Sequence, residues 1–315
     1  MIAFGTNPVT PGGATLSGTT ATNAVAGVAT FSDLSINKPS TYTLIASIIG
    51  PILQTSNQFV ISAGPPTKLV FATNPGDTPA TSPLSPTLQV EVRDAADNVV
   101  TNYNGTVTIQ IGNNPSSGTL SGATTVPVVN GVASFSNLSI DKAGTGYTLV
   151  ATGGSLTQAT STAFDITVGA PATLEFSVQP SNAIAGDAIS PAIVVRVLDA
   201  GGNLVTSYNS DVSLGIQTNP GGGTFITPAA ATVAASGGIA TFNNIAIDKS
   251  GVGYALQATS ENLTPVTSAP FNITHAAAAA LVFQTSPGNT EVNANLTPAP
   301  VVRVVDIYGN TVTSA

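Results

Sequence analysis

The residues with the clearest capacity for chemistry are three aspartates that each stand four positions before an asparagine. The pairs are Asp94 with Asn98, Asp199 with Asn203, and Asp306 with Asn310. Carboxylate and amide oxygens are ligands that calcium prefers, but a tight site needs several acids together, and none of these pairs has such a cluster in the sequence. An aspartate that opens a turn accepts hydrogen bonds from its own backbone, and asparagine tolerates the left-handed conformation. We therefore predict three turns and no metal site.

The sequence offers few residues that could act in catalysis. The only histidine is His275, which precedes a run of alanines, and one histidine cannot supply a Ser/His/Asp set to several copies of a unit. Asp94 and Asp97 form an acid pair that suits general acid–base catalysis. Asp97 is replaced by Gly202 and Gly309 in the matching positions, which favours a turn. The sequence predicts no catalytic residue, no cofactor and no enzyme activity.

These turns belong to a unit that recurs about every 105 residues. The turn reads VRDAADN at 92–98, VLDAGGN at 197–203 and VVDIYGN at 304–310. A second signature reads AGVATFSDLSIN at 26–37, NGVASFSNLSID at 130–141 and GGIATFNNIAID at 237–248. A constant period indicates one structural unit copied in series.

The period divides the chain into four segments. Two copies are complete, at 65–169 and 170–275, while 1–64 has only the back part of a copy and 276–315 only the front part. One interpretation is that the chain is a window on a longer repetitive protein. The other is that 276–315 pairs with 1–64 of another copy and builds an open-ended filament. Both interpretations predict unpaired apolar strand edges at the two ends.

Composition limits the class of protein. Apolar residues make up 42% and charged residues 7%, and 31 Gly and 22 Pro favour many short strands joined by tight turns with almost no helix. The net charge is −8, and the seven Lys and Arg are scattered, which excludes nucleic acid and anionic membrane surfaces as partners. No apolar run reaches the roughly 18–20 residues that span a membrane. The absence of cysteine removes disulfides and suits oxidising surroundings.

The strand pattern is clearest within 65–169. Residues 88–93 and 106–111 alternate between apolar and polar side chains, as strands with one buried face do. Asn130–Gly131 is a strong hairpin signal, and a slip in the alternation near 136–137 predicts a bulge or a break. About seven strands fit this segment, which predicts an immunoglobulin-like sandwich of two antiparallel sheets. A parallel β-solenoid is disfavoured because its repeats are shorter, about 20–30 residues.

Two sets of tyrosines are distinguished by their regularity. Tyr42, Tyr147 and Tyr254 occur once per copy beside an inward-facing strand. We predict tyrosine corners, with the ring in the core and the hydroxyl on a nearby backbone group, in preference to a sugar-stacking row. The second set lies in or after the Asp turn and is expected to be exposed, as the first place to look for a contact surface: Tyr103, Tyr208 and Tyr308.

The turn, the second signature and the recurring tyrosine together resemble tandem bacterial Ig-like repeats. The motifs are D-x-x-x-N, G-V-A-T-F-x-x-L-S-I-D and G-x-G-Y-T-L-x-A, and they cover the whole chain. Such repeats occur in large surface and secreted proteins and are similar in architecture to invasin and intimin stalks. The resemblance implies serial Ig-like sandwiches that act as stalks, spacers or adhesive arms. One departure is Asn37, which stands where Asp141 and Asp248 stand in the other copies.

Three functions remain open from the sequence. The preferred one is an extracellular structural protein, a stalk or a head-to-tail filament, whose partners are other copies (276–315 with 1–64 of the next chain) or further repeats of the same chain. The second is an adhesin arm that binds a glycan or a protein through its loops. The third is the non-catalytic part of an enzyme.

Overall fold

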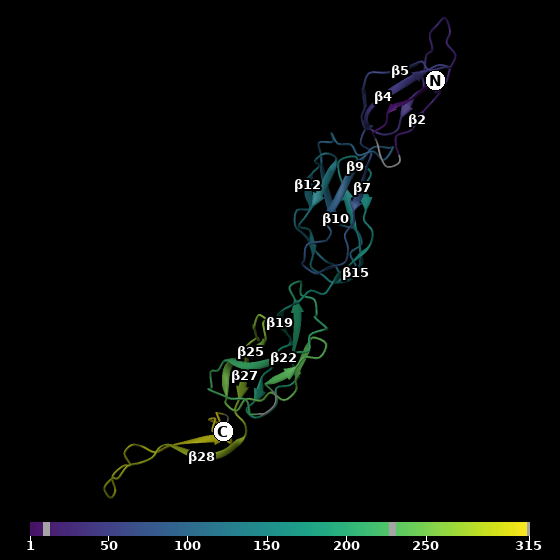
Figure 1. Cartoon of the computed structure of the whole chain (residues 1–315). Coiled ribbons are helices and arrows are strands. Elements are labelled where there is room, and N and C mark those ends of the chain that lie inside the picture. Colours follow the sequence, from purple (N-terminus) through teal and green to yellow (C-terminus); the bar gives the residue numbers. More distant parts are fainter. Residues whose placement is uncertain (9–12, 227–230, 314–315) are drawn as a thin grey trace. The chain divides into compact units, whose positions relative to one another are not determined.

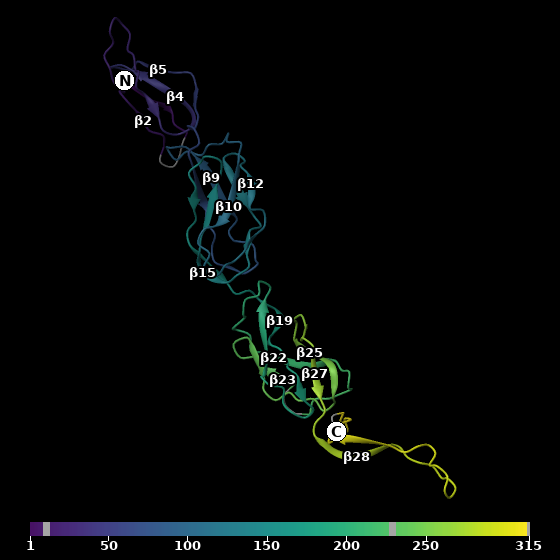
Figure 2. The same ribbon diagram turned by 180° about the vertical axis from the view of Figure 1, so that it is seen from behind.

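The computed structural model describes residues 1–8, 13–226 and 231–313, and every regular element in these ranges is a β-strand. The chain forms two compact units, Met1–Thr78 with Ser82–Thr167, and Pro79–Thr81 with Val168–Ala315. Figures 1 and 2 follow the strands of both units along the chain. Within the described ranges, no helix is long and apolar enough to cross a membrane. The protein is all-β, as predicted.

The segment 65–169 is a sandwich of antiparallel sheets. Its first sheet has the order β13 (Val132–Phe135), β9 (Leu88–Arg93), β7 (Lys68–Thr73). The opposing sheet has the order β12 (Thr125–Pro127), β10 (Thr106–Ile111), β16 (Leu149–Thr152), β17 (Ala159–Thr160). The predicted alternation of buried and accessible side chains in 88–93 is confirmed, because Leu88, Val90 and Val92 are fully buried between the sheets.

Short strands complete this segment. They are β8 (Thr78–Pro79), β11 (Leu120–Ser121), β14 (Ser139–Ile140), β15 (Gly144–Tyr147) and β18 (Phe164–Thr167). The predicted break near 136–137 is confirmed, since β13 ends at Phe135 and β14 begins at Ser139. The expected count of about seven strands is too low. Local irregularities divide runs that the pattern treats as one, for example between β15 and β16.

The segment 170–275 repeats this architecture. One sheet has the order β19 (Pro171–Val178), β21 (Ile193–Asp199), β24 (Ile239–Phe242). The other runs β20 (Ala183–Ile184), β27 (Phe271–Thr274), β25 (Gly251–Ser260), β22 (Asp211–Thr218), β23 (Thr232–Ala234), with β26 (Val266–Thr267) on β25. Val195 pairs with Ala240 across β21 and β24, as Val90 pairs with Ala133 across β9 and β13.

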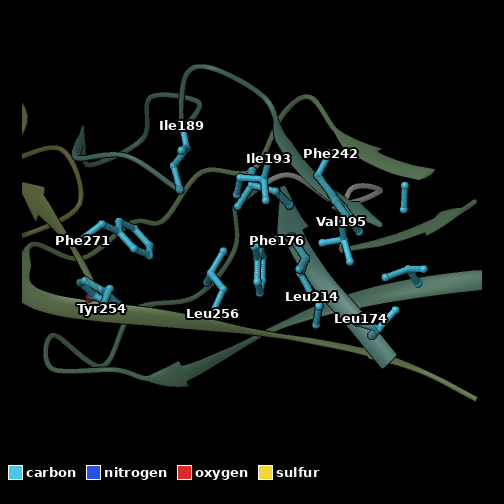
Figure 3. Close-up of a cluster of buried hydrophobic side chains, with 14 of the residues drawn as sticks. Leu174, Phe176, Ile189, Ile193, Val195, Leu214, Phe242, Tyr254, Leu256 and Phe271 are labelled. Atoms are coloured by element: carbon cyan, nitrogen blue, oxygen red, sulfur yellow. The ribbon is translucent and has the colours of Figure 1, made fainter. Parts of the chain in front are cut away.

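The core lies between the two sheets. Alternate residues of β19 and β21, including Phe176 and Val195, meet alternate residues of β22 and β25, including Leu214 and Leu256. Figure 3 shows these side chains gathered in the space between the strands. Burial of large apolar side chains of this kind contributes about 1.5–3 kcal/mol each relative to leaving them exposed. The two sheets are therefore held face to face mainly by apolar packing.

The remaining segments contain parts of the same pattern. Residues 1–64 form β1 (Ile2–Thr6), β2 (Leu16–Ser17), β3 (Ser35–Ile36), β4 (Ser40–Ser47), β5 (Leu53–Thr55) and β6 (Phe59–Ile61). The C-terminal segment forms a single antiparallel pair, β28 (Ala278–Thr285) with β29 (Val301–Asp306). The alanine run at 276–280 enters β28 and is not helical.

Candidate functional site: the Asp–Asn turns

One carboxylate oxygen of each turn aspartate, Oδ1, accepts hydrogen bonds from two backbone amides of its own turn. Asp199 Oδ1 accepts hydrogen bonds from the backbone amides of Gly201 at 2.9 Å and Asn203 at 2.8 Å. Asp94 binds Ala96 and Asn98 at 2.9 and 2.8 Å, and Asp306 binds Tyr308 and Asn310 at 2.9 and 2.8 Å. The prediction that these aspartates bond to their own backbone is confirmed.

The second carboxylate oxygen reaches the linker that precedes each copy, which the sequence did not reveal. Oδ2 of Asp94, Asp199 and Asp306 accepts a hydrogen bond from the backbone amide of Gly64 at 2.9 Å, Gly169 at 2.8 Å and Ala276 at 2.8 Å, respectively. All three donors lie 30 residues upstream of their aspartate. One carboxylate thus ties a turn and an entering linker together.

The sequence pointed to the asparagine as the left-handed residue of each turn. In the structure, the residue before the asparagine takes this conformation instead. Asp97 has φ 65°, Gly202 has φ 75° and Gly309 has φ 78°. A left-handed conformation costs a residue with a side chain roughly 1–2 kcal/mol, so glycine is favoured here. Asp97 remains at its position with a side chain that forms an ion pair with Lys68 at 2.7 Å.

The turn carboxylates are buried and hydrogen-bonded. Burial raises the pKa of Asp199, but the amides of Asn203, Gly169 and Gly201 and the Asn203 side chain outweigh it and hold the pKa below its ordinary value. The pKa values of Asp94 and Asp306 are lowered through the same balance of burial and hydrogen bonding. Hydrogen bonds to a charged carboxylate are the stronger kind, so these turns are firmly fixed.

The asparagine of the turn carries the contact into the preceding copy. Asn98 Nδ2 donates to the carbonyl of Asn37 at 3.2 Å, and Asn310 Nδ2 donates to the carbonyl of Asp248 at 2.9 Å. Asn310 also accepts a hydrogen bond from the Ser250 amide at 3.0 Å. Turn and preceding copy are therefore connected within each compact unit.

The junction before 276–315 has two further contacts. Lys249 Nζ donates to the carbonyl of Tyr308. The Tyr308 ring packs against the core of 170–275, where Gly186 leaves room for it. A methyl group on Gly186 would collide with this ring, so the glycine is required by close approach.

The residues at the end of the second signature share one role. Asn37 Oδ1 accepts from the Thr15 amide at 2.7 Å, while Asp141 and Asp248 accept from Thr119 and Thr224 at 2.6 Å. An amide oxygen and a carboxylate oxygen are both acceptors, which explains why asparagine substitutes here.

A cation would compete with donors that already occupy the turn. The two Asp199 oxygens receive three backbone amides and the side-chain amide of Asn203. In the part of the chain that the structure describes, no three His, Cys, Asp or Glu residues group as a metal site would require. The geometry supports a structural turn. His275 lies in the linker with Nδ1 at 2.9 Å from the Ala276 carbonyl oxygen.

The regular tyrosines are corners, as predicted. Tyr42, Tyr147 and Tyr254 are fully buried, and their hydroxyls donate to the carbonyls of Lys38, Lys142 and Lys249, each at 2.9 Å. The prediction that the second set is exposed is wrong, because Tyr103, Tyr208 and Tyr308 are all half-buried. The Tyr103 ring lies against Gly105, and the rings of Tyr208 and Tyr308 pack against the core of 170–275.

No protein-family model matches the sequence. No curated protein matches it. Among solved structures, the surface-layer protein SbsC (domains 4–9) is 16% identical over 78% of this chain and 37% of its own, with a TM-score of 0.25. Chimeric titin Z1Z2 is 16% identical over 68% and 100%, with a TM-score of 0.22. The complex of Dpr2 Ig1–Ig2 with DIP-Theta is 12% identical over 76% and 73%, with a TM-score of 0.28.

Likenesses at these TM-scores carry no argument about function. The fold assignment rests on the strand pairing and burial described above, and the resemblance to invasin and intimin stalk repeats stays a prediction. The chain spans about a third of the length of the surface-layer structure.

Proposed function

We propose that this protein is an extracellular structural protein, without catalytic activity, whose Ig-like domains in series form a stalk or a head-to-tail filament. The observation that carries the proposal is the double role of the Asp–Asn turn. The carboxylate fixes the linker of its own domain, and the asparagine amide reaches the backbone of the preceding domain.

A mechanical role follows from where these contacts lie. A linker with free backbone bends easily, whereas a linker whose amide is bound to a buried carboxylate loses that freedom. At the junction before 276–315, Tyr308 adds apolar packing to the hydrogen bonds. Junctions restrained in this way suit a stalk or spacer, which keeps its two ends at a distance from each other.

The composition supports a setting outside the cell. A chain without cysteine has no thiol to oxidise, and a surface with few charges and many Thr, Ser and Asn residues suits end-to-end packing. The net charge of −8 disfavours nucleic acid and anionic membranes as partners. Partners are then other copies of the chain or further repeats.

Junction stiffness can be measured with spin labels, because the chain has no native cysteine. The variant Thr55→Cys/Gln110→Cys places one exposed label on each side of the 1–64/65–169 junction. Double electron–electron resonance on dilute protein should give a narrow distribution of the distance between the two labels. Adding Asn98→Ala, which removes the bond to the Asn37 carbonyl, should broaden it.

The matched control is Asn104→Ala, a change at an exposed asparagine of the same domain. It should leave the distribution narrow. A parent distribution as broad as that of Asn98→Ala would remove the support for a spacing role, because the turn would then not restrain the junction.

The adhesin alternative has one observation in its favour. The β4–β5 hairpin tip carries Ile48, Ile49, Ile52 and Leu53, all strongly exposed. A cluster of exposed apolar side chains marks a surface that can bind a protein partner. Saturable binding of a ligand that is lost on Ile49→Ser would favour this function.

A further inference from the structure

Asp97 occupies a backbone position that the other copies fill with glycine. Its φ of 65° is left-handed, and the matching residues Gly202 and Gly309 have φ values of 75° and 78°. A side chain is disfavoured in this conformation, because its Cβ comes close to the following carbonyl oxygen. A residue that holds such a conformation where glycine would fit better points to a role for its side chain.

Positive charge gathers around the Asp97 carboxylate. The chain has seven Lys and Arg residues, and three of them act on this one group. Lys68 Nζ lies 2.7 Å from Asp97 Oδ1, and Arg93 Nη1 lies 3.9 Å from the same oxygen. The third is Lys38, which belongs to the preceding copy. These cations hold the pKa of Asp97 below its ordinary value, with Lys68 as the largest cause and Lys38 as the smallest.

Lys38 is held beside the turn by its own main chain. Asn98 Nδ2 donates to the Asn37 carbonyl at 3.2 Å, and this carbonyl belongs to the peptide group that joins Asn37 to Lys38. The Lys38 carbonyl accepts a hydrogen bond from the Tyr42 hydroxyl at 2.9 Å. The backbone on both sides of the Lys38 side chain is therefore fixed next to the residue that follows Asp97.

The junction before 276–315 shows the same geometry independently. Lys249 matches Lys38, because each of them accepts the hydroxyl of the regular tyrosine of its copy. Lys249 Nζ donates to the carbonyl of Tyr308, the residue before Gly309. A Cβ added to Gly309 would lie 4.0 Å from Lys249 Nζ, with no other atom closer. This turn position therefore faces the lysine of the preceding copy.

We propose that Asp97 restrains the 1–64/65–169 junction through its attraction to Lys38, and that this junction loosens as the salt concentration rises. The inference rests on the spacing role proposed above and adds its regulation by salt. The side chains of Asp97 and Lys68 are 59% and 33% exposed, so the cluster is open to solvent. Mobile ions therefore screen the attraction between the two copies.

The junction before 276–315 is held in a different way. Glycine replaces the carboxylate there, and Lys249 binds a carbonyl that has no net charge. The Tyr308 ring adds apolar packing against the core of 170–275. Neither contact joins two opposite charges, so this junction should keep its restraint in salt.

The test compares label distances across the first junction at low and high salt. Thr55→Cys/Gln110→Cys is measured by double electron–electron resonance on dilute protein in about 0.01 M and about 1 M sodium chloride, where the Debye length is about 30 Å and about 3 Å. The distance distribution should be broader at high salt. Asp97→Asn keeps the shape of the side chain and tolerates the left-handed backbone, so it should give the broad distribution at both concentrations.

Two lysine variants show which charge acts across the junction. Lys38→Gln removes the cation of the preceding copy and should abolish the salt dependence. Lys68→Gln is the matched control, because it also removes a cation beside Asp97, but one that lies within 65–169. The salt dependence should survive this change. Equal loss of salt dependence in both variants would overturn the proposal, because the effect would then not depend on the link between the two copies.

The matching glycine allows the contact to be transferred. Thr241→Cys/Gln284→Cys places exposed labels on β24 and β28, on the two sides of the junction before 276–315, and its distribution should not change with salt. Adding Gly309→Asp should make the distribution narrower at low salt than at high salt. Gly309→Asn requires the same backbone conformation without the charge and should leave the width independent of salt. A Gly309→Asp distribution that ignores salt would overturn the assigned geometry.

The outcomes separate this inference from the proposed function. A first junction that is equally narrow at both salt concentrations, and that broadens only with Asn98→Ala, overturns the role of Asp97 and still supports the spacing role. A first junction that is equally broad at both concentrations overturns the role of Asp97 and also removes the support for a spacing role.

Discussion

The turn aspartate is the residue on which the junctions depend. Asp199 accepts bonds from its own turn and from the Gly169 amide, which lies 30 residues earlier. Its charge matters as much as its shape, because every surrounding donor points at an oxygen. A neutral amide of the same shape would place an N–H group among other donors, leaving at least one of them without an acceptor.

Asp199→Asn should therefore destabilise 170–275 by roughly 2 kcal/mol, the value typical of a hydrogen bond to a charged group. Native-state hydrogen exchange of the β21 and β22 amides reports the loss locally. Asp187→Asn, at an exposed aspartate of the same segment, should change the exchange free energy by less than about 0.5 kcal/mol. Equal effects of the two variants would contradict the assigned role.

The lowered pKa values of Asp94, Asp199 and Asp306 set the pH dependence. A carboxyl whose pKa is lower in the folded chain contributes stability that is present above its unfolded value of about 3.9. That contribution is lost as the pH falls through the folded value. Unfolding free energy measured by urea titration should fall below about pH 4. Asp199→Asn should reduce this slope, and an unchanged slope would contradict the prediction.

Tyr254 donates its hydroxyl to the Lys249 carbonyl while its ring is fully buried. Tyr254→Phe keeps the ring and removes the bond, so we expect a loss of about 1 kcal/mol in the unfolding free energy of 170–275. Hydrogen exchange in β25 measures it. Tyr103→Phe is the comparison, because no hydrogen bond of the Tyr103 hydroxyl is found among the described residues. This change should lower the unfolding free energy by less than Tyr254→Phe does.

At the scale of elements, the sequence was informative where periodicity and turn chemistry act locally. The alternation in 88–93 predicted the buried face of β9. Asn130–Gly131 predicted a hairpin, and the structure has one there, closed by Val129 and Val132, with φ values of 50° and 81° at the two turn residues. The tyrosine corners were also predictable, because one tyrosine recurs beside an inward-facing strand.

Other features depend on contacts that no local pattern encodes. The bond between Asp94 and the Gly64 amide joins segments 30 residues apart, and the one between Asn98 and Asn37 joins two copies. Tyr308 was misjudged because its burial comes from Gly186, far away in the sequence. The recurrence of Asp and Gly at fixed spacing was the available signal. It indicated a turn, but it did not indicate that the turn binds the linker and the preceding copy.

The hairpin glycines give a test at this scale. Gly131→Ala should destabilise 65–169 by about 2–3 kcal/mol, through the left-handed φ of 81° and the contact with Val99 and Val100. Gly27→Ala carries the same φ cost without the contact, so in dilute protein we expect only about 1 kcal/mol. Urea titration compares the two, and equal losses would contradict the unfilled space beside Gly27.

Across the whole molecule, the same contact recurs where one copy follows another. The turn asparagine reaches the preceding copy at Asn98 in one compact unit and at Asn310 in the other. We therefore expect the Asp–Asn turns to restrain these junctions.

Spin-label distances across the 1–64/65–169 junction, measured in dilute protein with Thr55→Cys/Gln110→Cys, test this role most directly. We predict a narrow distribution that broadens when Asn98→Ala removes the bond to the Asn37 carbonyl. Distributions of equal width with and without Asn98→Ala would contradict it.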